Sequence, residues 1–99
     1  MIVKITDYAI GHLVRSVEVT MRGASLEKQE AMIDGVIDAA EILAQRPHAG
    51  QVEVWMDGRD HEYRRLVVGN FKVIYRIDGE VIHVTDIFDS RQNPKRMRG

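Results

Sequence analysis

Hydrophobic positions along the chain follow a strand pattern first and a helix pattern directly after it. Residues 2–5 are rich in β-branched side chains, which favours a short strand, and Thr6 or Asp7 can cap a following helix. The next apolar residues recur at helical spacing until Gly23 and form one stripe: Ile10, Leu13, Val14, Val17 and Met21. The sequence therefore predicts a strand and then a helix with one buried side.

A second helical pattern begins after Ser25, which can act as its cap. Its apolar stripe consists of Met32, Ile33, Val36, Ile37, Ala40 and Leu43. Pro47 and Gly50 end this pattern. Because only a short link separates the two stripes, we expect an antiparallel pair of helices.

From residue 51 onward the pattern is that of strands. A weaker run predicts a strand at Gln51–Met56 and a loop at Asp57–Asp60. Three stronger runs follow: Tyr63–Val68, Phe71–Ile77 and Val81–Phe88. Gly69-Asn70 and Asp78-Gly79 separate these runs, and both dipeptides predict two-residue hairpin turns. We therefore expect an antiparallel meander, with Asp78-Gly79 as the stronger signal because both central residues of that turn type need positive φ.

Two-residue turns determine which strand residues face each other. In this register Val68 faces Phe71, Ile77 faces Glu80, and Ile74 faces His83. One face is then mainly apolar, with Glu80 and Asp86 as its polar members, and collects Leu66, Val68, Phe71, Val73, Tyr75, Ile77, Ile82, Val84 and Phe88. Two helices can cover this face, so we expect an α+β fold with the helices packed on one side of the sheet.

The second face of the sheet is the main candidate site, because solvent or a partner should meet it. Its cations are candidates for binding an anionic or acidic target: Arg65, Lys72, Arg76 and, by continued alternation, Arg91. Its apolar residues suggest that another chain covers it: Val67, Ile74, Val81 and Ile87. Thr85 and His83 belong to the same face. The imidazole of His83 could serve as a base near neutral pH. The alternative for the cations is that they only keep the surface soluble, and the alternative for His83 is a structural role.

The chain length and composition bound these expectations. A chain of 99 residues is the length of one domain, and we expect a single domain over residues 1–99. It has no cysteine, which excludes disulfides and thiolate metal sites and fits a reducing compartment. Lys4 and Asp7 interrupt the first apolar residues, so we expect neither a signal peptide nor a membrane span. We expect a cytoplasmic protein that needs no cofactor and holds no metal, because its histidines lack ligand spacing.

Charge is distributed unevenly along the chain although its net value is −1. Lys and Arg outnumber Asp and Glu between residues 64 and 98. An acidic run lies on the second predicted helix and contains Glu27, Glu30, Asp34, Asp38 and Glu41. Asp34, Asp38 and Glu41 share one side of that helix, either as solvated charge or as a docking surface for a basic partner.

The order of elements and the C-terminal sequence resemble the RelE/ParE toxin superfamily. The matching segments are the break at Pro47–Gly50, the stretch Gly69–Arg76 and the closing Phe88–Pro94. The resemblance covers almost the whole chain. It implies the toxin of a type II toxin-antitoxin system, used for plasmid stabilisation or growth control and neutralised by a cognate antitoxin. For such a toxin, the apolar residues of the open face become the candidate antitoxin contacts.

The superfamily implies two kinds of activity. RelE-like members cut messenger RNA on the ribosome without a metal, whereas ParE-like members inhibit DNA gyrase without cleaving RNA. Arg65, Lys72 and Arg91 match basic positions of the nucleases, where they would bind the scissile phosphate, and His83 would carry a proton.

Two positions favour the ParE-like activity. Asn93 and Met97 stand where the nucleases are expected to carry an arginine and a tyrosine. We therefore favour a non-nucleolytic gyrase inhibitor and keep the ribosome-dependent endonuclease as the alternative. A degenerate domain that only binds its partner is a second alternative. The sequence does not decide the oligomeric state, and a homodimer is one option.

Overall fold

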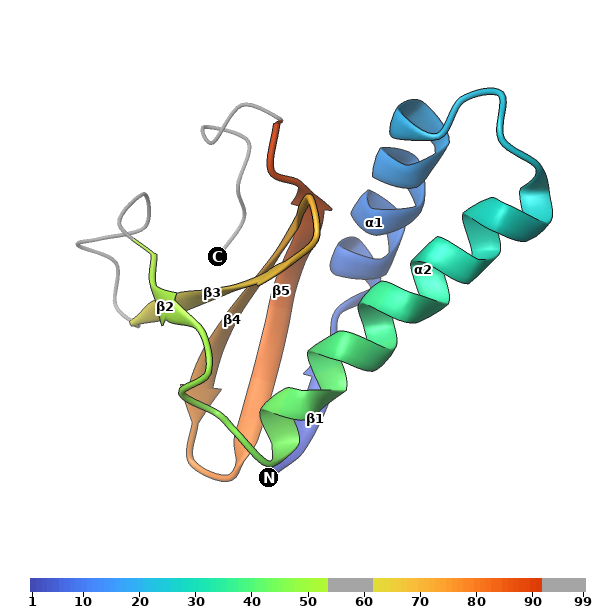
Figure 1. Cartoon of the computed structure of the whole chain (residues 1–99). Helices are drawn as coiled ribbons and strands as arrows, with labels where there is room; N and C mark the ends of the chain where they lie inside the picture. The colour runs from blue at the N-terminus through green and yellow to red at the C-terminus, as the bar shows by residue number, and fades with distance from the viewer. Residues whose placement is uncertain (54–61, 92–99) are drawn as a thin grey trace.

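The computed structural model describes residues 1–53 and 62–91. Figure 1 shows two helices, α1 (Asp7–Thr20) and α2 (Leu26–Ala40), on the same side of a five-stranded sheet. A short 3-10 helix, η1 (Glu41–Ala44), continues α2. This is the predicted α+β arrangement, in which both helices pack on one face of the sheet.

Both helices begin at the side-chain caps that the sequence predicts. Thr6 Oγ1 accepts a hydrogen bond from the N–H of Ala9 at 3.0 Å, and Ser25 Oγ accepts one from the N–H of Lys28 at 3.2 Å. These bonds satisfy amide groups that have no partner within the first helical turn. Gly23, with φ at 92°, lies in the link between the helices, which run in opposite directions in Figure 1.

The sheet has the order β1-β5-β4-β3-β2. Its strands are β1 (Ile2–Ile5), β2 (Gln51–Val52), β3 (Tyr63–Val68), β4 (Phe71–Asp78) and β5 (Val81–Asp89). β1 runs parallel to β5, and the other neighbours are antiparallel, so β3, β4 and β5 form the predicted meander. Within the described residues β2 ends at Val52, whereas the sequence predicts a strand Gln51–Met56, whose last three residues lie outside them. Residues 54–61, which include the predicted loop, lie outside the described residues.

The first hairpin has the predicted register. Gly69 and Asn70 form its turn, and Val68 pairs with Phe71. Gly69 has a φ of 58° in the first turn position, and no described residue other than glycine has a positive φ. This is the pattern of a type II′ turn, which needs a positive φ at its first central residue alone.

The second hairpin turns one residue later than predicted. Its turn is Gly79-Glu80, with Gly79 at a φ of 61°, and Asp78 pairs with Val81. The predicted pairing of Ile77 with Glu80 is therefore wrong. The glycine again takes the first turn position, so Asp78 stays in the strand and avoids the positive φ that the predicted turn would have required.

A β-bulge interrupts the ladder between β4 and β5. Tyr75 pairs with Val84, but the next pair is Ile74 with Asp86. Thr85 is the extra residue that this step leaves without a partner in the ladder. From this point on, every residue of β5 points to the face opposite the predicted one, because side chains alternate with a period of two.

The bulge overturns the predicted faces of the β5 residues that follow it. Ile87 pairs with Val73 on the helix-covered face, whereas we predicted it on the open face. Phe88 pairs with Lys72 on the open face, whereas we predicted it in the core. Asp86 likewise lies with Ile74 on the open face. The bulge thus keeps an aspartate out of the apolar layer beneath the helices.

The core between the helices and the sheet is built largely from the predicted stripes. It contains Ala9, Leu13, Val17, Val36, Ala40, Leu43, Phe71, Val73, Tyr75, Ile82, Val84 and Ile87. Met32, which we predicted in this stripe, is 40% exposed and lies at the side of α2. A second, smaller cluster of buried residues lies on the open face and contains Tyr63, Ile74 and Phe88.

Tyr75 ties the link between η1 and β2 to the sheet. Its hydroxyl donates to the carbonyl of Pro47 at 2.8 Å and accepts from the N–H of Gly50 at 2.9 Å. Arg64 Nη1 donates to the carbonyl of Gly50 at 2.9 Å. Burial raises the pKa of Tyr75, against the opposing effects of the Gly50 N–H and the Arg64 charge. The phenol therefore keeps its proton at neutral pH and remains a donor to Pro47.

Candidate functional site

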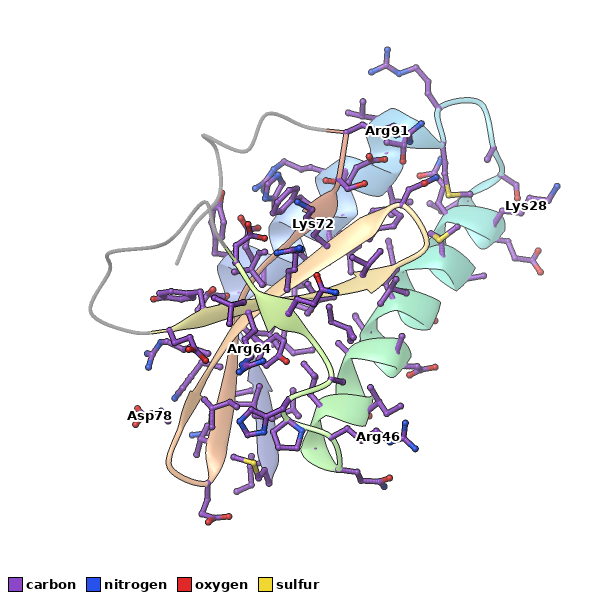
Figure 2. The ribbon with its side chains drawn as sticks, turned by 60° about the vertical axis from the view of Figure 1, so that its left-hand side comes forward. Lys28, Arg46, Arg64, Lys72, Asp78 and Arg91 are labelled. Carbon is purple, nitrogen blue, oxygen red and sulfur yellow. The ribbon has the colours of Figure 1, made fainter. Side chains whose placement is uncertain are left out.

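The four cations predicted to bind a target are spread over the sheet. Arg65, Lys72 and Arg76 lie on the open face of β3 and β4, as alternation predicts. Arg91 follows the end of β5, where Figure 2 shows it apart from Lys72, which lies over the strands. Lys72 is half-buried between its ladder partners Val67 and Phe88.

Arg65 is held by β2 and the residue that follows it. Its Nη1 donates to the carbonyl of Val52 at 2.8 Å, and its Nη2 donates to Gln51 Oε1 at 2.9 Å. The same Nη1 lies 3.9 Å from Oε2 of Glu53, a carboxylate in a residue that is 1% exposed. The charge of Arg65 is therefore balanced within the protein, and several of its donors are already used.

Arg76 and His83 share Asp78 as a neighbouring carboxylate. Arg76 Nη1 lies 3.6 Å and His83 Nε2 lies 3.8 Å from Asp78 Oδ2. The two residues pair across β4 and β5, so the predicted pairing of His83 with Ile74 is wrong. The later turn causes this difference, because the bulge lies beyond the pair of Tyr75 with Val84. His83 therefore lies next to an acid as well as next to the cations Arg76 and Lys4.

Arg91 is bound to Asp89 by three hydrogen bonds. Asp89 Oδ1 accepts from the Arg91 N–H at 2.8 Å and from Nε at 2.9 Å, and Oδ2 accepts from Nη2 at 2.6 Å. Asp89 pairs with Phe71 on the helix-covered side and is 1% exposed. The predicted place of Arg91 on the open face is therefore wrong. The Arg91 hydrogen bonds hold the pKa of Asp89 below its usual range, although burial opposes this shift.

Asp89 should make stability depend on acid pH. Its lowered pKa means that the carboxylate stabilises the fold above pH 3.8, the ordinary value, and that this contribution is lost as pH falls further. Asp89→Asn should cost about 1 kcal/mol at pH 7, a discounted value because Arg91 is largely exposed. Urea unfolding at pH 7 and pH 3 should show a smaller difference between the two chains at pH 3. An equal difference at both pH values would refute this origin.

A buried histidine-aspartate pair lies beside the open face, and the sequence did not predict it. His12 Nδ1 on α1 lies 2.7 Å from Asp86 Oδ1, and the imidazole stacks on Phe88 with ring centroids 5.5 Å apart. β1 pairs with β5 only as far as Val84, so α1 lies against the edge of β5 beyond that point. His12 therefore connects the helix layer to the open-face cluster around that edge.

The predicted antitoxin contacts differ widely in exposure. Val67 is 60% exposed and Val81 is half-buried, but Ile74 and Ile87 are fully buried. The prediction that all four lie exposed on the open face is therefore wrong for two of them. Ile74 packs with Phe88 in the open-face cluster, and the bulge turns Ile87 into the main core. Their role in antitoxin binding remains a prediction, with Val67 as the most accessible of the four.

The part of the chain that the structure describes contains no group of three or more acidic or histidine side chains arranged to hold a metal ion. Within the same residues, the helices are too short or too polar to span a bilayer.

A groove runs between α2 and strand β3. Its first part is a hollow of about 600 Å³, lined mainly by apolar atoms, between α2 and the β3–β4 hairpin. Its second part, of about 660 Å³, lies between β3 and the region where α2 passes into η1. Val68 lines both parts, so the two hollows are neighbours along the same side of the sheet. No sequence pattern indicated this groove, because helical periodicity cannot show how far α2 lies from β3.

The chain is similar to known toxins over most of its length. The model of a family described as the ParE toxin of the type II toxin-antitoxin system, parDE, matches residues 3–94. A solved structure described as the chromosomal ParDE TA system from P. aeruginosa matches with a TM-score of 0.71 and 18% identity. That match covers 90% of this chain and 95% of the other chain. No curated protein matches.

Proposed function

Because this chain belongs to the ParE toxin family of type II toxin-antitoxin systems, we propose that it arrests growth by binding DNA gyrase without cleaving RNA. The family makes it a toxin with a cognate antitoxin as its partner. The fold is that of the ParDE chain with which it aligns. Gyrase as the target and the absence of nuclease activity are the parts that we propose here.

The observation that carries this proposal is the neutralisation of the cations that the sequence predicts to bind a target. Arg65 has Glu53 as a neighbouring acid, Arg91 is held by Asp89, and Arg76 lies beside Asp78. Among the cations predicted to bind a target, Lys72 alone has no acidic partner within the described residues. Such a face suits a protein target better than a dense row of phosphates, whose binding rests on many uncompensated cations.

Metal-free RNA cleavage has requirements that these residues meet poorly. It needs a base for the 2′-hydroxyl, an acid for the leaving oxygen and several cations on the phosphorane. His83 lies one strand away from Lys72 and two strands away from Arg65, beside Asp78. Arg91 lies off the open face. Asn93 and Met97, which entered the comparison of activities, lie outside the described residues.

The two surfaces of the chain suit two partners. We assign the gyrase contact to the open face around Lys72, and the antitoxin contact to the groove beside α2 together with exposed Val67. Arg65 and Arg76 flank Lys72 on that face as additional target contacts. We further propose that the chain acts in the cytoplasm, where both gyrase and an antitoxin would be found.

Two assays on the purified chain test the proposal. Relaxed plasmid with gyrase should remain relaxed when the chain is added, and messenger RNA on ribosomes should stay intact. Ribosome-dependent cuts in the messenger RNA would contradict the gyrase proposal and support the RelE-like activity. Activity in neither assay, together with tight antitoxin binding, would identify a domain that only binds its partner.

Lys72→Glu should weaken gyrase inhibition about tenfold, because reversing a charge at a protein contact replaces attraction by repulsion. Figure 2 labels a matched control, Arg46, which is exposed near the end of η1 and away from the open face. Arg46→Glu makes the same change of net charge and should leave the inhibitory concentration unchanged. Equal changes of the inhibitory concentration in the two variants, each shown to be folded by circular dichroism, would show that the open face is not part of the target site.

A further inference from the structure

Helix α2 presents three different faces. The first packs into the core and contains Ile33, Val36, Ile37 and Ala40. The second lines the groove and contains Lys28, Ala31, Met32, Gly35 and Ala39. The third is the acidic row Glu27, Glu30, Asp34 and Asp38, all of them exposed, which Glu41 continues at the start of η1. At helical spacing the three faces lie roughly a third of a turn apart, so the acidic row borders the groove face on one side and the core face on the other.

The groove is chemically different at its two ends. The end near the β3–β4 turn is lined almost entirely by apolar surface, including Met21, Met32 and Phe71, with Lys28 as its one charged member. The other end contains Asp38 and Glu41 beside apolar residues. Neither acid forms an ion pair or a hydrogen bond through its side chain with any described residue.

The α2 side of the groove lets another chain approach the helix closely. Ala31, Gly35 and Ala39 lie at successive helical turns on the groove face, so that α2 offers little side-chain bulk there. A Cβ added at Gly35 would meet nothing within 4 Å. On the opposite wall, β2 pairs only with Arg64 and Arg65, so residues 66–68 of β3, which pair with β4 on their other side, have no partner strand on the groove side among the described residues.

We propose that this groove selects a basic amphipathic segment of the antitoxin. Apolar side chains of that segment fill the end beside Met32 and Phe71, and Lys or Arg side chains lie along the acidic row, nearest Asp38 and Glu41. The inference rests on the proposed assignment of the groove to the antitoxin and adds the charge of the partner. An acidic segment in the same place would lie against like charges, which costs several kcal/mol at a contact.

Charge reversal at the acidic end tests the proposal. The probe is the purified protein encoded next to the toxin gene, and its Kd is measured by calorimetry for wild-type and variant chains. Asp38→Lys/Glu41→Lys should raise the Kd about 100-fold, and Asp38→Asn/Glu41→Gln should raise it by less. Wild-type binding should also weaken with added salt. Unchanged or tighter binding after reversal would overturn the proposal.

Three further variants separate charge from fold. Glu18→Lys/Glu80→Lys makes the same change of net charge at exposed acids outside the groove and should leave the Kd unchanged. Gly35→Trp fills the groove and should abolish binding, whereas Gly35→Ala should retain it. Wild-type affinity of Gly35→Trp would show that the groove is not the antitoxin site. Gyrase inhibition by all these variants should match that of the wild type, so failure of the gyrase proposal would appear separately.

Discussion

Gly50→Ala should destabilise the chain by about 3 kcal/mol, at the upper end of the usual cost of overpacking. A Cβ at this position would lie 2.4 Å from the carbonyl oxygen of Arg65 and 2.7 Å from the hydroxyl of Tyr75. The first neighbour is backbone and cannot move without shifting β3. The substitution should also disturb the hydrogen bond from Gly50 to Tyr75 and the one from Arg64. Urea unfolding at neutral pH measures the loss.

The chain offers a matched control for this substitution. Gly35→Ala also adds one methyl group, but in the middle of α2 where the added atom meets nothing within 4 Å. It should stabilise the chain by about 0.5–1 kcal/mol, because alanine loses less backbone entropy than glycine in a helix. Opposite signs at the two glycines would support the close approach at Gly50. A stable Gly50→Ala variant would show that β2 and β3 have room to separate.

Local patterns were enough to predict the elements of this fold. Caps at Thr6 and Ser25, helical stripes and the glycine turns depend on neighbouring residues, and the helices and the meander strands appear where the sequence predicts them. The position of the second turn was wrong by one residue, because Asp78-Gly79 and Gly79-Glu80 both contain the glycine that a tight turn needs. A shift of this kind preserves the faces of the strands.

The bulge at Thr85 had larger consequences, because it exchanges the two faces of β5. Nothing in the sequence from Val81 to Asp89 marks the extra residue, and regular alternation placed Ile87 outside and Phe88 inside. The observed arrangement buries both side chains, one in each cluster. A bulge is favoured here by the sum of contacts on both faces, which depends on residues far away in the sequence.

The candidate site shows the same division between local and distant information. Alternation correctly placed Arg65, Lys72 and Arg76 on the open face, but it does not reveal which cations have acidic neighbours. The Asp89–Arg91 pair is local, and an aspartate two residues before a loop position is a recognisable signal for such a turn. The groove beside α2 has no local signal, since it depends on the packing of α2 against β3.

His12→Ala should destabilise the chain by about 2–4 kcal/mol, because it removes a donor from a buried carboxylate together with packed ring surface. Asp86 is fully buried and its Oδ1 lies 2.7 Å from His12 Nδ1, so the substitution takes one hydrogen bond from a buried carboxyl group. The ring also covers Phe88 in the open-face cluster. In a domain of this size, each kcal/mol lowers the Tm by about 4–8 °C, so the change should be large in thermal unfolding.

A double-mutant cycle separates the two contributions. Asp86→Asn replaces the carboxylate by a neutral amide, and it should cost less in the His12→Ala background than in the wild type, with a coupling of at least about 1 kcal/mol. Loss of ring packing alone predicts additive effects, since Asp86→Asn leaves Phe88 untouched. Additivity would therefore assign the effect of His12 to its contact with Phe88. Strong coupling would show that the contact between His12 Nδ1 and Asp86 Oδ1 itself stabilises the fold.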